Sequence, residues 1–163
     1  MYAVASEAEP AYAVVMFRQD GVWQAGLLPE TLTADLDGLV AAVRQQSGDG
    51  GSFALVDIAH EFFVVVRVVM GRVRLLLSDA TAALAWDLAG QVVERLDVEE
   101  PQEGDDVYPA GDLGVFDDLG LDEMELGAVL ADLDAYADEM LSTIAGRLGF
   151  ADAYERVVDA VAD

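Results

Sequence analysis

Short stretches rich in apolar residues fill much of the first half of the chain, a pattern typical of β-strands. Asp20-Gly21 separates the first two stretches, and this dipeptide favours a tight hairpin turn. Met70-Gly71 separates the last two and predicts a second tight turn. The pattern predicts strands at residues 11–17, 22–28, 52–58, 61–70 and 72–78.

A helical pattern lies between the second and third predicted strands. Apolar residues recur there at intervals of three and four, which places them on one face of a helix. Thr31 or Thr33 is a suitable residue to cap its N-terminus. The predicted buried face consists of Leu36, Leu39, Val40 and Val43.

A second helical pattern follows the fifth predicted strand and continues to about residue 96. Ser78 or Asp79 is a suitable N-cap for it. We expect its apolar stripe to lie on the sheet, with Leu84, Leu88 and Val92 buried.

The last third of the chain has three further stretches with helical spacing. Asp122 is a suitable N-cap for the first of them, and Glu123 and Glu125 favour the positive end of its dipole. The apolar positions of the three are Leu126, Val129, Leu130 and Leu133; Ala137, Leu141, Ile144 and Leu148; and Phe150, Tyr154, Val157, Val158 and Val161.

This order of elements predicts an α+β fold. We expect an antiparallel or mixed sheet of about five strands with helices packed chiefly on one face, plus a C-terminal helical subdomain. The expected division is a sheet domain at 1–97, an acidic linker at 98–111 and a helical subdomain at 112–163 that can dock on the sheet.

Acidic residues dominate the charge of the chain, which has 32 Asp and Glu against 8 Lys and Arg and a formal net charge of -24. Half of the acidic residues lie between Asp97 and Glu139, where no basic residue occurs. This balance argues against direct nucleic-acid binding, which depends on clustered Lys and Arg. Either the acidity only maintains solubility, or it attracts a basic protein partner. The candidate partner-binding residues are Glu99, Glu100, Glu103, Asp105, Asp106, Asp117 and Asp118.

Three of the eight basic residues, Arg67, Arg72 and Arg74, lie in an otherwise apolar stretch. A turn at Met70-Gly71 sets Arg67 opposite Arg74 and places all three guanidiniums on one face of the hairpin. In such surroundings a guanidinium needs water, an acidic partner or a bound anion. One interpretation is structural ion pairing with carboxylates of the acidic segment folded back, and the other is a face that binds a small anionic ligand.

Residues that commonly carry catalysis or bind metals are scarce. The chain has no cysteine and one histidine, His60, which excludes thiolate zinc sites and metal sites with two histidines. We therefore expect no catalytic residues, no metal and no cofactor. The start of the chain lacks a positively charged leader, and no apolar run approaches the roughly 20 residues that span a bilayer, so we expect a cytoplasmic protein without membrane contact.

The segment VFDDLGLDEMELGAVL, at 115–130, is similar to the part of acyl carrier proteins in which a serine carries phosphopantetheine. Glu123 occupies the serine position here. Without a hydroxyl group the segment has no attachment point, so a carrier function is excluded.

Five stretches give the chain a family resemblance: YAVVMFRQDGVWQ, DLDGLVAAVR, LLLSDATAAL, PAGDLGVFDDLGL and RLGF. The chain resembles the actinobacterial family of tRNA adenosine deaminase-associated proteins. The resemblance implies a partner or a genomic neighbour of that enzyme. It does not imply the activity, because the deaminase uses H-x-E and P-C-x-x-C motifs to bind zinc, whereas His60 is followed here by Glu61 and Phe62.

Three functions remain open. The first is a non-enzymatic accessory protein, associated with tRNA adenosine deaminase, with tRNA modification or with another basic protein. The second is a module that binds a small anionic ligand through the arginine face. The third is an enzyme that uses carboxylates, for which no paired acid and base can be located in the sequence.

Overall fold

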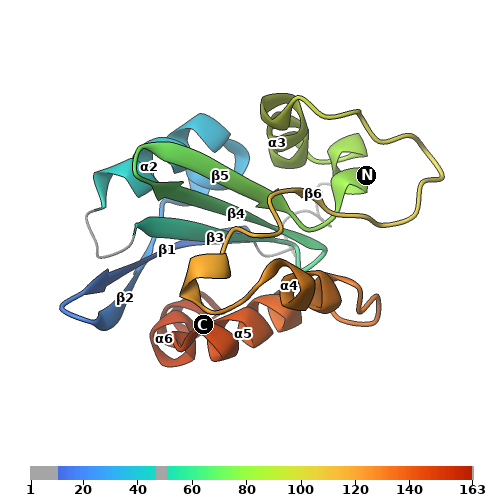
Figure 1. The fold of residues 1–163 in the computed structure, drawn as a ribbon. Coiled ribbons are helices and arrows are strands. Elements are labelled where there is room, and N and C mark those ends of the chain that lie inside the picture. The colour runs from blue at the N-terminus through green and yellow to red at the C-terminus, as the bar shows by residue number, and fades with distance from the viewer. Residues whose placement is uncertain (1–10, 47–50, 163) are drawn as a thin grey trace.

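The computed structural model describes residues 11–46 and 51–162. It contains one open antiparallel sheet of six strands in the order β2-β1-β3-β4-β5-β6, with helices on both faces (Figure 1). The strands are β1 (Ala11–Gln19), β2 (Val22–Leu27), β3 (Ser52–Ile58), β4 (Phe62–Val69), β5 (Arg72–Leu77) and β6 (Ala110–Gly111). The predicted α+β class is confirmed, with six strands instead of about five. Residues 1–10, from which the absence of a leader was predicted, lie outside the described residues.

Both predicted tight turns form. Asp20 and Gly21 have positive φ angles of 54° and 78°, and Met70 and Gly71 have φ angles of 51° and 78°. Two consecutive residues with positive φ are what a type I′ hairpin turn requires. The second turn sets the register of β4 and β5, in which Arg67 lies opposite Arg74, as predicted.

Two helices, α2 (Leu36–Gln45) and α3 (Asp87–Leu96), cover the same face of the sheet. The four apolar residues predicted for the first of them are all buried. Its predicted cap was wrong, because Thr31 and Thr33 lie in a preceding 3-10 helix, η1 (Glu30–Ala34). Asp35, the residue after η1, is the N-cap instead, because its carboxylate accepts a 3.0 Å hydrogen bond from Gly38 N.

The helix predicted from Ser78 or Asp79 to about residue 96 is interrupted. A 3-10 helix, η2 (Ala80–Leu84), comes first, and Asp79 caps it by accepting a hydrogen bond from Thr81 N. Trp86 then adopts an extended conformation before α3 begins. This break removes Leu84 from the buried stripe, so its predicted burial was wrong and it is 49% exposed. The other two residues of the stripe, in α3, are buried as predicted.

The opposite face of the sheet is covered by α4 (Glu123–Leu130), α5 (Ala137–Leu148) and α6 (Ala151–Ala162) (Figure 1). An aromatic cluster joins the two layers: Phe53 of β3 packs against Phe116 and Phe150, with ring centroids 5.2 and 5.5 Å apart. The three C-terminal helices were predicted correctly. The prediction that Leu133 lies on the apolar face of the first of these helices was wrong, because α4 ends before it and its side chain is 72% exposed.

Residues 98–109 connect α3 to β6, which pairs with the C-terminal end of β5. Gly111 belongs to β6 and adopts a φ of 101°, and a Cβ atom there would lie only 2.3 Å from Leu75 O. A glycine is required at this position because the strand backbones approach so closely. The residue after it, Asp112, donates its backbone N–H to Leu75 O at 2.8 Å. This attachment brings the following acidic residues over the arginines of the sheet.

Candidate functional site

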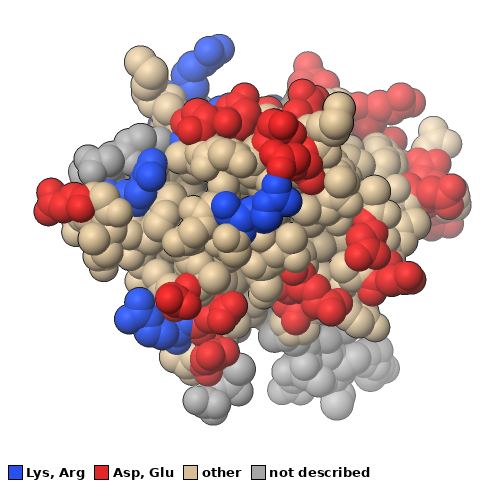
Figure 2. All heavy atoms as spheres, turned by 60° about the horizontal axis from the view of Figure 1, so that its bottom comes forward, with Lys and Arg blue, Asp and Glu red and all other residues tan. Residues whose placement is uncertain are grey.

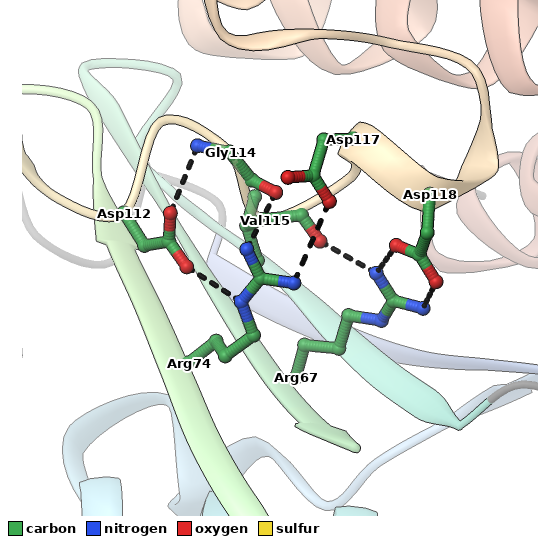
Figure 3. Close-up of polar contacts among 7 residues, drawn as sticks. All are labelled: Arg67, Arg74, Asp112, Gly114, Val115, Asp117 and Asp118. Carbon is green, nitrogen blue, oxygen red and sulfur yellow. Dashed lines mark hydrogen bonds and ion pairs between the residues drawn. The ribbon is translucent and has the colours of Figure 1, made fainter.

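An ion pair between a buried arginine and a half-exposed aspartate links β4 to the acidic segment. Arg67 is fully buried, and its guanidinium donates two hydrogen bonds to the Asp118 carboxylate, of 2.6 and 2.9 Å (Figure 3). It also donates a 2.6 Å bond to Val115 O. Asp118 is the middle residue of η3 (Asp117–Leu119), a single 3-10 turn, and its side chain is about half exposed. Bonding to the Arg67 guanidinium lowers the pKa of the Asp118 carboxyl below its ordinary value.

Arg74 makes a second set of contacts with the same segment. Its Nε donates to Asp112 at 2.5 Å, and its Nη2 donates to Gly114 O at 2.7 Å (Figure 3). Asp117 lies 3.7 Å from its Nη1. The bond to Asp112 raises the pKa of the Arg74 guanidinium. The arginine face therefore binds the loop 112–118 through charge-assisted hydrogen bonds.

Arg67 and Arg74 thus form ion pairs with carboxylates of the acidic segment, which is the first of the two interpretations given for the arginine face. Arg72 differs from the other two arginines, because it lies at the start of β5 opposite Val69, is exposed and has no ion pair with any carboxylate in the described parts of the chain. On the arginine face, which was the candidate for binding an anion in the second interpretation, protein carboxylates thus contact Arg67 and Arg74.

The predicted partner-binding acidic residues fall into two groups. Asp117 and Asp118 contact the arginines, although about half of each side chain is exposed. The rest lie in the irregular segment between α3 and β6 and are exposed: Glu99, Glu100, Glu103, Asp105 and Asp106. We call these five residues the acidic strap. In Figure 1 this segment extends to the right of the sheet. In Figure 2, which is turned about the horizontal axis, acidic side chains also lie on the right, whereas the basic side chains lie to the left and centre.

A second polar cluster, which was not predicted, surrounds the side chain of Asp57 in β3. This carboxylate is completely buried and accepts hydrogen bonds from Tyr12 Oη at 3.0 Å and from His60 N at 2.9 Å. Its Oδ2 also lies 2.7 Å from His60 Nδ1. Burial raises the pKa of the Asp57 carboxyl, and the bonds from His60 and Tyr12 oppose that shift.

The backbone at this cluster is a tight turn between β3 and β4. Ala59 and His60 both have positive φ, 56° and 58°, a conformation that non-glycine residues rarely adopt. His60 O accepts a 3.0 Å hydrogen bond from Ala137 N at the start of α5, which ties the turn to the C-terminal helices. The available signal in the sequence was an aspartate within an apolar strand, three residues before the sole histidine.

Two further findings concern metal binding and membrane insertion. Among residues 11–46 and 51–162, no group of three or more His, Cys, Asp or Glu side chains is arranged to hold a metal ion. Within the same residues, no helix is long and apolar enough to cross a membrane.

Comparison with known proteins gives two matches. The model of a family described as Rv3753c-like tRNA adenosine deaminase-associated protein matches residues 11–151, from the start of β1 to the start of α6. The chain is also similar to Protein Rv3753c of Mycobacterium tuberculosis, with 40% identity over 163 residues that cover 98% of this chain and 94% of the relative. No solved structure matches the chain.

Proposed function

Because the chain belongs to the Rv3753c-like tRNA adenosine deaminase-associated protein family, we propose that it is a non-enzymatic accessory protein that binds a tRNA adenosine deaminase directly. The family description names the chain's relatives as associated with the deaminase and not as the deaminase itself. We place this association in the cytoplasm and give the chain a role in tRNA modification as part of the same proposal.

The acidic strap carries the proposal. Its five carboxylates are exposed and lie in a segment without a helix or a strand, between α3 and β6. A local excess of one charge steers the encounter with a surface of the opposite charge and helps to fix the orientation of the complex. The strap therefore favours a partner with a basic surface.

The charge also limits how the chain could take part in tRNA modification. A net charge of -24 repels the phosphate backbone. A basic face on the deaminase that contacts the acidic strap would at the same time be withheld from RNA. We therefore propose contact with the enzyme, without direct contact between this chain and tRNA.

The alternative, a module that binds a small anion on the arginine face, is weakened by the observed contacts. An anion at Arg67 or Arg74 would have to displace carboxylates bonded at 2.5 to 2.9 Å. Bidentate pairing of this kind is strong and geometrically specific. The exposed Arg72 is left as a single surface cation, which does not form a ligand site by itself.

Calorimetry with the purified deaminase tests the proposal. In one variant the five residues of the acidic strap are changed to Gln or Asn, and in a matched control five exposed acidic residues elsewhere are changed in the same way. The control positions are Asp20, Glu30, Glu94, Glu155 and Asp159. The expected result is binding that weakens as salt shortens the Debye length to about 10 Å or less, and that weakens at least about tenfold in the strap variant but not in the control.

Three outcomes would count against the proposal. If the intact chain does not bind the deaminase at low salt, the direct association is refuted. If both variants lose affinity equally, net charge and not the strap is responsible. If binding does not respond to salt, the partnership stands and its acidic mechanism is refuted.

A further inference from the structure

A pocket of about 310 Å³ lies beside the β3–β4 turn, where four separate parts of the chain meet. His60 and Glu61 come from the turn, Ser78 and Asp79 follow β5, and Val107 precedes β6. The rest of the wall comes from the end of α4, the start of α5 and the connection between them. The inference that follows rests on the proposed function, because it specifies which side chain a basic partner inserts.

Apolar side chains that are unusually exposed form one wall of this pocket. Leu133 is 72% exposed, Tyr136 is 67% exposed and Val107 is 50% exposed. They belong to segments far apart in the sequence but line the same cavity. Exposed large apolar side chains that converge in this way mark interaction sites. Tyr136 also offers an aromatic face, which attracts cations.

The polar end of the pocket favours a hydrogen-bond donor. The His60 ring and the carboxylates of Glu61 and Asp79 line this end. The contact between His60 Nδ1 and the buried Asp57 carboxylate, at 2.7 Å, holds the ring in place. Carboxylate oxygens only accept hydrogen bonds, so a donor on a partner suits this end of the pocket.

The charges around the pocket are negative. Glu61 and Asp79 line it, and Asp138 lies 3.8 Å from His60 Nδ1. No lysine or arginine lines this cavity within the described residues. The N-terminus of α5, which would favour an anion, carries Asp138 and Glu139 in its first turn, and Glu139 caps it by accepting a bond from Tyr136 N. The pocket is therefore suited to a cation.

We propose that this pocket receives the side chain of an arginine or lysine presented by a basic segment of a partner protein. The aliphatic stem packs on Leu133 and Tyr136, as long basic side chains do on apolar surfaces. The charged head faces the surrounding carboxylates, which accept its hydrogen bonds. The acidic strap lies next to Val107 in the sequence, so steering and insertion act on the same side of the molecule.

The first test uses a synthetic probe. The isotope-labelled chain is titrated with a capped pentapeptide of glycines around one central arginine, and separately with the same peptide in which neutral citrulline replaces the arginine. The expected chemical-shift changes come from residues 60–61, 78–79 and 133–140, with the arginine peptide only. Shifts that are equal for both peptides, or that lie elsewhere, would overturn the proposal.

Variants then separate this proposal from the proposed function. L133S/Y136A removes two of the three exposed residues of the apolar wall, and M124S alters an apolar residue on α4 that is 84% exposed and does not line the pocket. The wall variant should bind the arginine peptide and the deaminase about tenfold more weakly, with M124S unchanged. If the deaminase binds the wall variant normally, the pocket proposal fails and the association stands. If the arginine peptide binds and the deaminase does not, the association fails and the pocket proposal stands.

Discussion

Removing the carboxylate of Asp118 should destabilise the protein more than removing the guanidinium of Arg67, although the two groups form one ion pair. The reason is the difference in exposure, which is 0% for the Arg67 side chain and 51% for that of Asp118. In D118A a buried charge loses its carboxylate partner, whereas in R67M a half-exposed carboxylate returns to water. Removing the exposed partner costs more stability, because it leaves the buried charge without a carboxylate.

The magnitude follows from the hydrogen bonds that are lost. D118A removes two bonds from Arg67, of 2.6 and 2.9 Å. Bonds to charged groups contribute about 1.5–3 kcal/mol each, and the half-exposure of Asp118 reduces that value, so the expected loss is about 2–3 kcal/mol. R67M leaves Val115 O without its side-chain donor, which should lower the free energy of unfolding by about 1 kcal/mol. A loss of about 2–3 kcal/mol corresponds to a Tm about 5–10 °C lower for a chain of this size.

Urea denaturation of the two single variants and of R67M/D118A measures these differences. The double variant should be about as stable as R67M, because no buried charge remains in it, and the two changes should therefore be strongly non-additive. Circular dichroism of each variant checks that the fold persists. If R67M is the less stable single variant and the two losses add, the burial argument is refuted.

Three further predictions concern the fold, the pH dependence and the absence of catalysis. Replacing Gly111 with Ala should lower the free energy of unfolding by about 2 kcal/mol or more, because the new Cβ would lie 2.3 Å from Leu75 O at a φ of 101°. The control is Gly127→Ala in α4, where the Cβ meets open space, and it should be neutral or slightly stabilising. Arg67 lowers the pKa of Asp118 from its ordinary value of 3.8. The contribution of the ionised Asp118 to the free energy of unfolding is therefore fully present above pH 3.8 and is lost as the pH falls through the lowered pKa. The stability difference between the protein and D118N should accordingly shrink in denaturation experiments as the pH falls below 3.8, and a constant difference would contradict it. Finally, the purified chain should form no inosine in tRNA when zinc is supplied, as mass spectrometry of digested tRNA can check; inosine above the level without protein would show an activity of its own.

Local signals in the sequence were sufficient for the two tight hairpins. Asp20-Gly21 and Met70-Gly71 define their turns, and each turn then fixes a strand register by geometry alone. The position of Arg67 opposite Arg74 follows from the second of these turns. The C-terminal helices were predictable for a similar reason, because their apolar spacing and the Asp122 cap act within a few residues.

Apolar spacing alone did not locate the breaks and ends of helices. Leu84 continues the four-residue spacing of the stripe in α3, so the sequence contains no local sign that the chain breaks at Trp86. Leu133 likewise continues the spacing of α4 but lies beyond the end of that helix, in the wall of the pocket.

The candidate sites were only partly predictable. Pairing of the arginines with the acidic segment was one of two interpretations of the sequence. The particular partners could not be predicted, because Arg67 and Asp118 are 51 positions apart and no local pattern connects them. The contact of His60 with Asp57 is short-range, at three residues, and requires the unusual positive φ of the turn. That conformation is set by how β3 and β4 pair, which residue types alone do not specify.

Light scattering of a mixture of the purified chain and the purified tRNA adenosine deaminase, at low salt and without RNA, tests the central claim most directly. The proposed direct association predicts a species whose mass is the sum of the two proteins, and predicts that this species dissociates when salt is raised or when the acidic strap is neutralised. Two separate proteins at every salt concentration would contradict the claim.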